Sequence, residues 1–248
     1  MQRPTVIFLD AVGTLFGIRD SVGYLYSQLA RQVGVEVSAI AVDQAFRKSF
    51  GASPPPTFTY LNANALLQQE YQWWKAIAAS TFQQAGVLAQ FADFDRFFED
   101  LYHYFATPDP WVLYPEVLPT LQQCHNNAIQ LGVLSNFDSR LHAVLQVLGL
   151  TEFFSSVTIS TQVGAAKPDS GIFMAALQAH HCPAEAAWHV GDSYQEDYAG
   201  AQSAGLQGIW LKRPGETMPT RTDGHDREAA LSIKSLDELT SLTSFARL

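Results

Sequence analysis

The chain begins with a short apolar run that ends in a carboxylate. Thr5-Val6-Ile7-Phe8-Leu9 leads directly into Asp10. A β-branched and aromatic run of this length, closed by a polar residue, predicts a buried strand over residues 5–10. Gly13 and Gly17 follow and loosen the chain after the strand.

The next segment, from Ser21 to about Phe105, has a helical pattern throughout. Apolar residues such as Leu25 and Leu29 recur at three- and four-residue steps, as they do on one face of a helix. The Pro54-Pro55-Pro56 run interrupts the series, and Thr107-Pro108-Asp109-Pro110 ends it. Two prolines so close together cannot continue a helix.

After this block, apolar runs of strand length alternate with amphipathic stretches of helix length. The expected strands are Leu131–Leu134, Ser156–Ser160, Ala187–Val190 and Gln207–Leu211. The expected helices are Val117–Asn127, Arg140–Leu148, Ile172–His180 and Tyr198–Ala204. Strands that alternate with helices imply crossover units and a parallel sheet.

The strand at 5–10 has no sheet partner nearby in sequence, so the helical block is expected to be an insertion. The predicted fold class is therefore α/β, a doubly wound, Rossmann-like parallel-sheet core with an inserted helical cap. We assign residues 1–16 and 109–248 to the core and residues 17–108 to the cap. Pro214–Arg227 is polar and expected to be a loop, and Leu231–Leu242 is expected to supply a last strand and helix.

Composition limits the partners and the compartment. The chain has 248 residues, of which 47% are hydrophobic, and a net charge of −9, which argues against nucleic acid or an anionic membrane as partner. Asp10 interrupts the one early apolar run, so neither a transmembrane segment nor a signal peptide is expected. Cys124 and Cys182 are expected to be reduced thiols of a cytoplasmic protein. Oligomeric state is not predicted.

Polar residues follow the predicted strands where ligands bind in a doubly wound sheet. Asp10, Asp192 and Asp197 form an oxygen-rich set suited to Mg²⁺. Ser135 and Lys167 are expected to face a transferring phosphoryl group. The further candidates for binding substrate are Thr14 and Asn136.

These segments resemble, in order, the four motifs of the haloacid dehalogenase superfamily, in its subfamily with a helical cap after the first strand. The resemblance covers about residues 5–212. Ser135–Leu141, the cap pair Trp73-Trp74, and His189–Asp192 with Asp197-Tyr198 are most similar to the haloacid dehalogenase-like hydrolase domain-containing protein 3 group, also called rhythmically-expressed-gene-2-like.

The resemblance implies a role for each motif residue. Asp10 would be the nucleophile that forms an aspartyl-phosphate, an intermediate that divides one difficult displacement into two easier ones. Ser135 and Lys167 would bind the phosphate of a small phosphorylated metabolite. Asp192 would ligate Mg²⁺, helped by Asp197 and the backbone carbonyl of Val12.

Val12 departs from the pattern of the superfamily's phosphatases, which carry a general acid/base Asp there. Loss of such a group typically costs about 10²–10⁴-fold in rate. We therefore expect a Mg²⁺-dependent hydrolase of the phosphatase type with altered or weak activity. Two alternatives remain open: carbon–halogen or carbon–phosphorus cleavage by Asp10, with Lys48 or Lys75 as the cap lysine for the latter, and a non-catalytic protein that binds a phosphorylated ligand or a protein partner.

Three other prominent side chains are expected to have structural roles. Trp73 and Trp74 are predicted to pack the helices of the cap. Asp138 follows Ser135 closely, and we favour a helix-capping role for it over a role in the site.

Overall fold

A six-stranded sheet forms the centre of the computed structural model, which describes residues 3–60, 62–214 and 230–245. The strand order is β5-β4-β1-β6-β7-β8, and all neighbours are parallel. The strands are β1 (Val6–Leu9), β4 (Gln130–Ser135), β5 (Ser156–Ile159), β6 (Ala187–Gly191), β7 (Gln207–Leu211) and β8 (Ser232–Ile233). The predicted parallel-sheet α/β class is confirmed.

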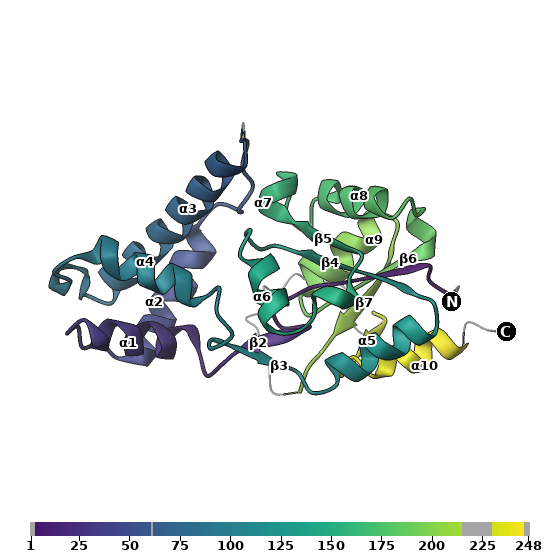
Figure 1. Ribbon diagram of the computed structural model, residues 1–248, viewed down its shortest axis with the longest axis horizontal. Coiled ribbons are helices and arrows are strands. Elements are labelled where there is room, and N and C mark those ends of the chain that lie inside the picture. The colour runs from purple at the N-terminus through teal and green to yellow at the C-terminus, as the bar shows by residue number, and fades with distance from the viewer. Residues whose placement is uncertain (1–2, 61, 215–229, 246–248) are drawn as a thin grey trace.

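Helices cover both faces of this sheet (Figure 1). Alternate residues of β1 face opposite sides, so that Phe8 belongs to one core cluster while Ile7 and Leu9 belong to the other. The helices on the Phe8 side are α8 (Ser170–Ala179) and α9 (Gly200–Ser203). Those on the other side are α5 (Val117–Asn126), α6 (Leu141–Val147) and α10 (Glu238–Phe245). The short helices are α7 (Ser160–Val163) and η1–η3 (Leu88–Gln90, Thr151–Phe153 and Ala184–Ala186).

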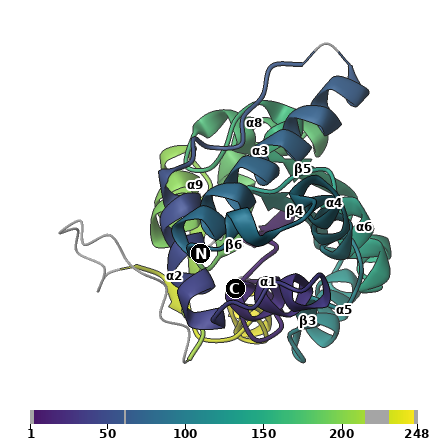
Figure 2. The ribbon, with the colours of Figure 1, turned by 90° about the vertical axis from the view of Figure 1, so that its left-hand side faces the viewer.

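Four α-helices occupy the chain between β1 and α5, and they lie in front of the sheet in Figure 2. They are α1 (Val22–Gln32), α2 (Ala39–Ala52), α3 (Ala63–Gln84) and α4 (Phe94–Tyr104). Their apolar faces form a separate core around Tyr26, Phe82 and Phe97. We call these four helices the helical block. The boundaries of a distinct cap at residues 17–108 stay a prediction.

A short hairpin joins the helical block to the sheet, and sequence reasoning did not find it. β2 (Phe16–Ile18) pairs antiparallel with β3 (Trp111–Leu113). The two segments are three residues long and lie about ninety residues apart, so neither shows a periodicity that identifies a strand. Packing provides the signal instead, because Phe16 and Trp111 meet edge to face with their ring centroids 5.2 Å apart.

The predicted start of the helix at Tyr198–Ala204 was wrong. A π-helical turn, η4 (Tyr194–Ala199), begins four residues earlier and runs directly into α9. Ser193 caps it, since its Oγ accepts a hydrogen bond from the backbone N–H of Glu196. The turn places Asp197 close to the end of β6, where its Oδ2 accepts from the backbone N–H of Ser193 at 2.9 Å.

β8 and α10 close the fold, which confirms the last strand and helix expected within Leu231–Leu242. The loop expected at Pro214–Arg227 lies, apart from Pro214, outside the described residues. Cys124 and Cys182 are unpaired, as predicted. Within the part of the chain that the structure describes, no helix combines the length and apolar character needed to cross a membrane.

Candidate active site

Three of the predicted site residues stand at the carboxyl ends of adjacent parallel strands. Asp10 follows β1, Ser135 ends β4, and Asp192 follows β6. β1 pairs with both of the other strands, so the three side chains meet at one edge of the sheet, where doubly wound folds bind ligands. Lys167 reaches the same edge from the loop between α7 and α8.

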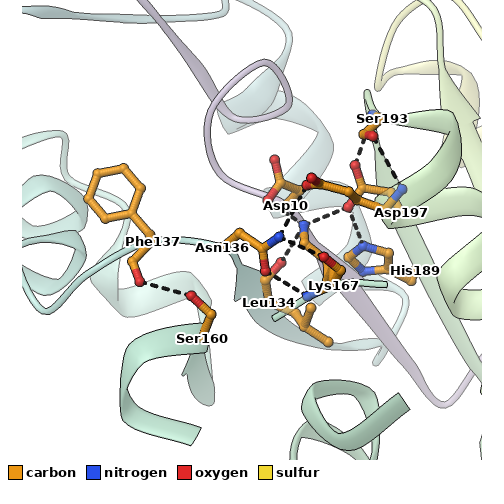
Figure 3. Close-up of polar contacts among 10 residues, drawn as sticks. Asp10, Leu134, Asn136, Phe137, Ser160, Lys167, His189, Ser193 and Asp197 are labelled. Atoms are coloured by element: carbon orange, nitrogen blue, oxygen red, sulfur yellow. Dashed lines mark hydrogen bonds and ion pairs between the residues drawn. The ribbon is translucent and has the colours of Figure 1, made fainter. Parts of the chain in front are cut away.

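Lys167 is the centre of this polar cluster (Figure 3). Its Nζ lies 2.6 Å from Asp10 Oδ1 and 2.5 Å from Asp197 Oδ1, and it also donates to the carbonyl of Leu134 at 3.3 Å. Burial alone would lower the pKa of this ammonium, but the two carboxylates more than offset it and raise the pKa above the ordinary value. Lys167 is therefore a fixed positive charge.

Both carboxylate oxygens of Asp197 accept hydrogen bonds. Its Oδ1 accepts from Lys167 and from His189 Nε2 at 2.8 Å, and its Oδ2 accepts from the backbone N–H of Ser193 at 2.9 Å. Burial would raise the pKa of this carboxyl, yet Lys167 and His189 hold the pKa well below its ordinary range. Asp197 thus stays ionised and fixes the Lys167 ammonium beside Asp10.

Asp192 lies against the turn that follows Asp10. A Cβ added to Gly13 would come within 2.5 Å of Asp192 Oδ2, and Gly13 has a φ of +83°, a conformation that favours glycine. Burial, together with the charge of Asp10, raises the pKa of Asp192 to about 8. The site therefore holds more carboxylate than Lys167 can neutralise.

This surplus of carboxylate fits a divalent cation. Asp10, Asp192 and Asp197 each offer an oxygen, and these oxygens lie within 4.8 Å of one another. Carboxylate oxygens are the ligands that Mg²⁺ prefers, and a cation here would favour the ionised form of Asp192. The oxygens of Asp197 already accept three hydrogen bonds, so Asp10 and Asp192 are the better candidates for direct ligands.

The candidate phosphate-binding residues differ in how free their polar atoms are. Ser135 is buried. Burial raises the pKa of the Asp10 carboxyl, and the Ser135 hydroxyl lies near enough to this carboxyl to oppose the rise. Asn136 donates to the carbonyl of Lys167 at 3.0 Å and to Glu196 at 3.1 Å, and it accepts from the Lys167 N–H at 2.7 Å. Asn136 therefore holds the Lys167 loop. Thr14 Oγ1 is buried and has no hydrogen-bond partner among the described residues.

Val12 contributes only an apolar side chain at this edge. It is half-buried and packs against the larger core cluster. It forms an isolated bridge with Phe16, where the hairpin toward the helical block begins. The side chain at this position has no proton to give or take, whereas its backbone carbonyl is retained.

The capping role predicted for Asp138 is met in the turn that leads into α6, where its Oδ1 accepts a hydrogen bond from the backbone N–H of Arg140 at 2.9 Å. The N-cap residue of α6 itself is Arg140, whose side chain makes no capping hydrogen bond. The Asp138 carboxylate also accepts from Arg140 Nε at 2.8 Å and Nη2 at 2.7 Å, and from Trp74 Nε1 at 2.7 Å. Trp74, on α3, therefore contacts the loop that follows β4. Its ring also packs on Trp73 and on Phe50 of α2, in line with its predicted role in packing these helices.

Glu70 makes a second contact between α3 and the loop after β4. Its side chain is fully buried, and Oε1 accepts from the Ser139 N–H at 3.0 Å, Ser139 Oγ at 2.9 Å and Thr161 Oγ1 at 2.5 Å. Burial raises the pKa of this carboxyl. Sequence reasoning missed Glu70 because a single Glu on a helix ordinarily predicts an exposed charge.

The two lysines considered for carbon–phosphorus cleavage have simpler positions. Lys75 forms an ion pair with Asp95 at 2.8 Å, and Lys48 is exposed on α2. Neither position favours that alternative.

Comparison with known proteins gives the family. The family model for haloacid dehalogenase-like hydrolase matches residues 4–205. Haloacid dehalogenase-like hydrolase domain-containing protein 3 of Danio rerio is 35% identical over 233 residues, covering 94% of this chain and 93% of that protein.

Two solved structures share the fold at low identity. The L-2-haloacid dehalogenase of Xanthobacter autotrophicus superposes with a TM-score of 0.68 at 17% identity, covering 97% of this chain and 98% of that chain. A phosphatase of the same superfamily from Thermococcus onnurineus gives a TM-score of 0.62 at 21% identity, with full coverage of both chains, 100% each. On the family model and the curated relative, this chain belongs to the haloacid dehalogenase-like hydrolase family.

Proposed function

We propose that this chain is a Mg²⁺-dependent hydrolase of phosphate esters, with Asp10 as nucleophile. The observation that carries the proposal is the close arrangement of Asp10, Asp192 and Asp197 around Lys167 at one edge of the sheet. Members of the superfamily generally use a divalent metal, and the surplus of carboxylate here suits one.

In the first step, an oxygen of the Asp10 carboxylate attacks phosphorus. A bond forms between Asp10 and phosphorus, and the ester bond breaks with its electron pair going to the leaving oxygen. Lys167 and the Ser135 hydroxyl are fixed donors for the phosphoryl oxygens. In the second step, water attacks phosphorus and releases inorganic phosphate and the Asp10 carboxylate. Mg²⁺, when bound, neutralises negative charge on the phosphoryl group.

Val12 determines which esters react quickly. An alkoxide leaving group needs a proton as the bond breaks, and the Val12 side chain supplies none. A phenolate or carboxylate leaving group is stable without one. We therefore propose that aryl and acyl phosphates are hydrolysed much faster than alkyl esters such as sugar phosphates.

Turnover separates this proposal from the two alternatives. Carbon–halogen cleavage by Asp10 needs no metal. The presence of a further carboxylate, Asp192, beside Asp10 therefore favours the phosphatase hypothesis. The absence of a general acid at Val12 favours a non-catalytic protein that binds a phosphorylated ligand. Such a protein would be stabilised by Mg²⁺ and a phosphate analogue without releasing phosphate.

The test is phosphate release from an aryl phosphate, with and without Mg²⁺, compared with Asp10→Asn. Turnover that requires both Mg²⁺ and Asp10 supports the proposal. Asp109→Asn, an exposed carboxylate outside the site, is the matched control and should keep wild-type turnover. Undiminished activity in Asp10→Asn would contradict the assignment of the nucleophile.

A further inference from the structure

Arg213, in the segment after β7, contacts the turn that follows Asp10. It lies two residues beyond the end of β7. Its Nε donates to the carbonyl of Gly13 at 3.0 Å, and its Nη2 donates to the carbonyl of Thr14 at 2.8 Å. One planar guanidinium thus holds two successive carbonyls of the same turn, which the compact ammonium of a lysine does not reproduce.

The turn that Arg213 holds is tightly wound and touches the candidate metal site. The N–H groups of Thr14, Leu15 and Phe16 all donate to the carbonyl of Ala11, at 3.3, 2.8 and 3.2 Å. Gly13, within this turn, packs directly against the Asp192 carboxylate. A shift of the turn therefore changes the distance between Asp192 and the segment that carries Asp10.

Arg213 is itself fixed by the segment that returns from the helical block. Its Nη1 lies 2.6 Å from Glu116 Oε1, and the side chains of this pair are only 9% and 16% exposed. Its guanidinium carbon lies 3.6 Å from the centre of the Tyr114 ring. Tyr114 follows β3, and its N–H donates to the carbonyl of Leu15 at 3.3 Å. The guanidinium therefore contacts both connections between the sheet and the helical block.

We propose that Arg213 is a positioning residue that holds the turn at residues 11–16 against Asp192 and so sets the geometry of the metal site. It acts on the site through the Gly13 and Thr14 carbonyls. Its importance for turnover rests on the proposed function, whereas its effect on the turn and on metal binding does not. No motif points to this residue, because its partners are backbone atoms two hundred positions away.

The experiment measures Mg²⁺ binding by calorimetry in the full chain, comparing wild type with Arg213→Met and Arg213→Lys. Residues that orient metal ligands typically change metal affinity by roughly 10–100-fold, so Arg213→Met should raise the Mg²⁺ dissociation constant by that factor. Arg213→Lys keeps the charge and loses the paired donors, so it should also weaken binding. Arg47→Met, which removes an exposed arginine of α2, should leave it unchanged.

Hydrogen exchange supplies a readout that is independent of metal and turnover. In Arg213→Lys, the amides of residues 14–16 should exchange at least tenfold faster, while those of β1 and β6 keep wild-type rates. This comparison also decides the matter if Arg213→Met does not fold. Wild-type exchange in this turn, or an unchanged Mg²⁺ dissociation constant in Arg213→Lys, would overturn the proposal. If the wild-type chain releases no phosphate, that result would count against the proposed function and not against the role of Arg213 in the turn.

Discussion

Replacement of Lys167 by methionine should destabilise the fold strongly. Lys167 is 4% exposed and forms ion pairs with Asp10 and Asp197 at 2.6 and 2.5 Å. Methionine has a similar length and no charge, so the variant keeps the volume and leaves two buried carboxylates without their cation. Removing one partner of a buried ion pair costs about 3–5 kcal/mol. For a chain of this size, that corresponds to a fall in melting temperature of roughly 6–20 °C.

Denaturant unfolding of the metal-free chain measures this change in the free energy of unfolding. Lys48→Met is the control, because Lys48 is exposed on α2 and such surface changes stay within about 0.5 kcal/mol. A destabilisation below about 1 kcal/mol in Lys167→Met would show that the two carboxylates do not depend on this cation.

A double-mutant cycle identifies the source of the effect. Asp197→Asn removes one of the two carboxylates that face Lys167, so the Lys167→Met change should cost less in that background than in the wild type. Contacting charges of this kind typically show interaction energies of about 0.5–3 kcal/mol. Additive effects of the two changes would show that the loss comes from packing instead.

Three further predictions address the chemistry, the metal and the helical block. Val12→Asp should raise Mg²⁺-dependent hydrolysis of an alkyl phosphate by about 10²–10⁴-fold in steady-state assays; unchanged rates, with Mg²⁺ still bound, would favour the binding-protein alternative. Burial and Asp10 raise the pKa of Asp192 to about 8 in the metal-free site, and Mg²⁺ binds the ionised form. Calorimetry should therefore show affinity rising about tenfold per pH unit between pH 6.5 and 8 and levelling off above; a flat profile would contradict this. Trp74→Phe removes the 2.7 Å hydrogen bond to Asp138, which, as a bond to a charged group, is worth about 1.5–3 kcal/mol. Limited proteolysis near residues 17 and 108 should become about tenfold faster, and equal cleavage of both chains would argue against an opening helical block.

The strand ends could be predicted because each motif joins two independent signals. Asp10, Ser135 and Asp192 each follow an apolar run, and parallel strands bring their carboxyl ends to one edge of a sheet. The sequence alone therefore places these side chains together. The sequence does not show which of these charged groups form ion pairs. Lys167 bridges Asp10 and Asp197 because of the path of two loops, and the spacing of the motifs does not reveal that path.

The parts that were missed depend on contacts between distant segments. β2 and β3 are too short to show a period, and their pairing comes from packing of Phe16 on Trp111. Glu70 and Arg213 are single charged residues whose partners lie 69 and about 200 positions away. A charged residue without a motif ordinarily predicts solvent exposure, and only the fold shows that these two are engaged.

Trapping the phosphoryl group on Asp10 is the sharpest test of Asp10 as the nucleophile. The chain is mixed with an aryl or acyl phosphate and Mg²⁺, quenched in acid, and digested for mass spectrometry. Because the Val12 side chain cannot act as a base to activate water, the peptide containing Asp10 should accumulate one phosphoryl group, and Asp10→Asn should show none. Phosphate release without this adduct in the wild-type chain, or an adduct that persists in Asp10→Asn, would rule out Asp10 as the nucleophile.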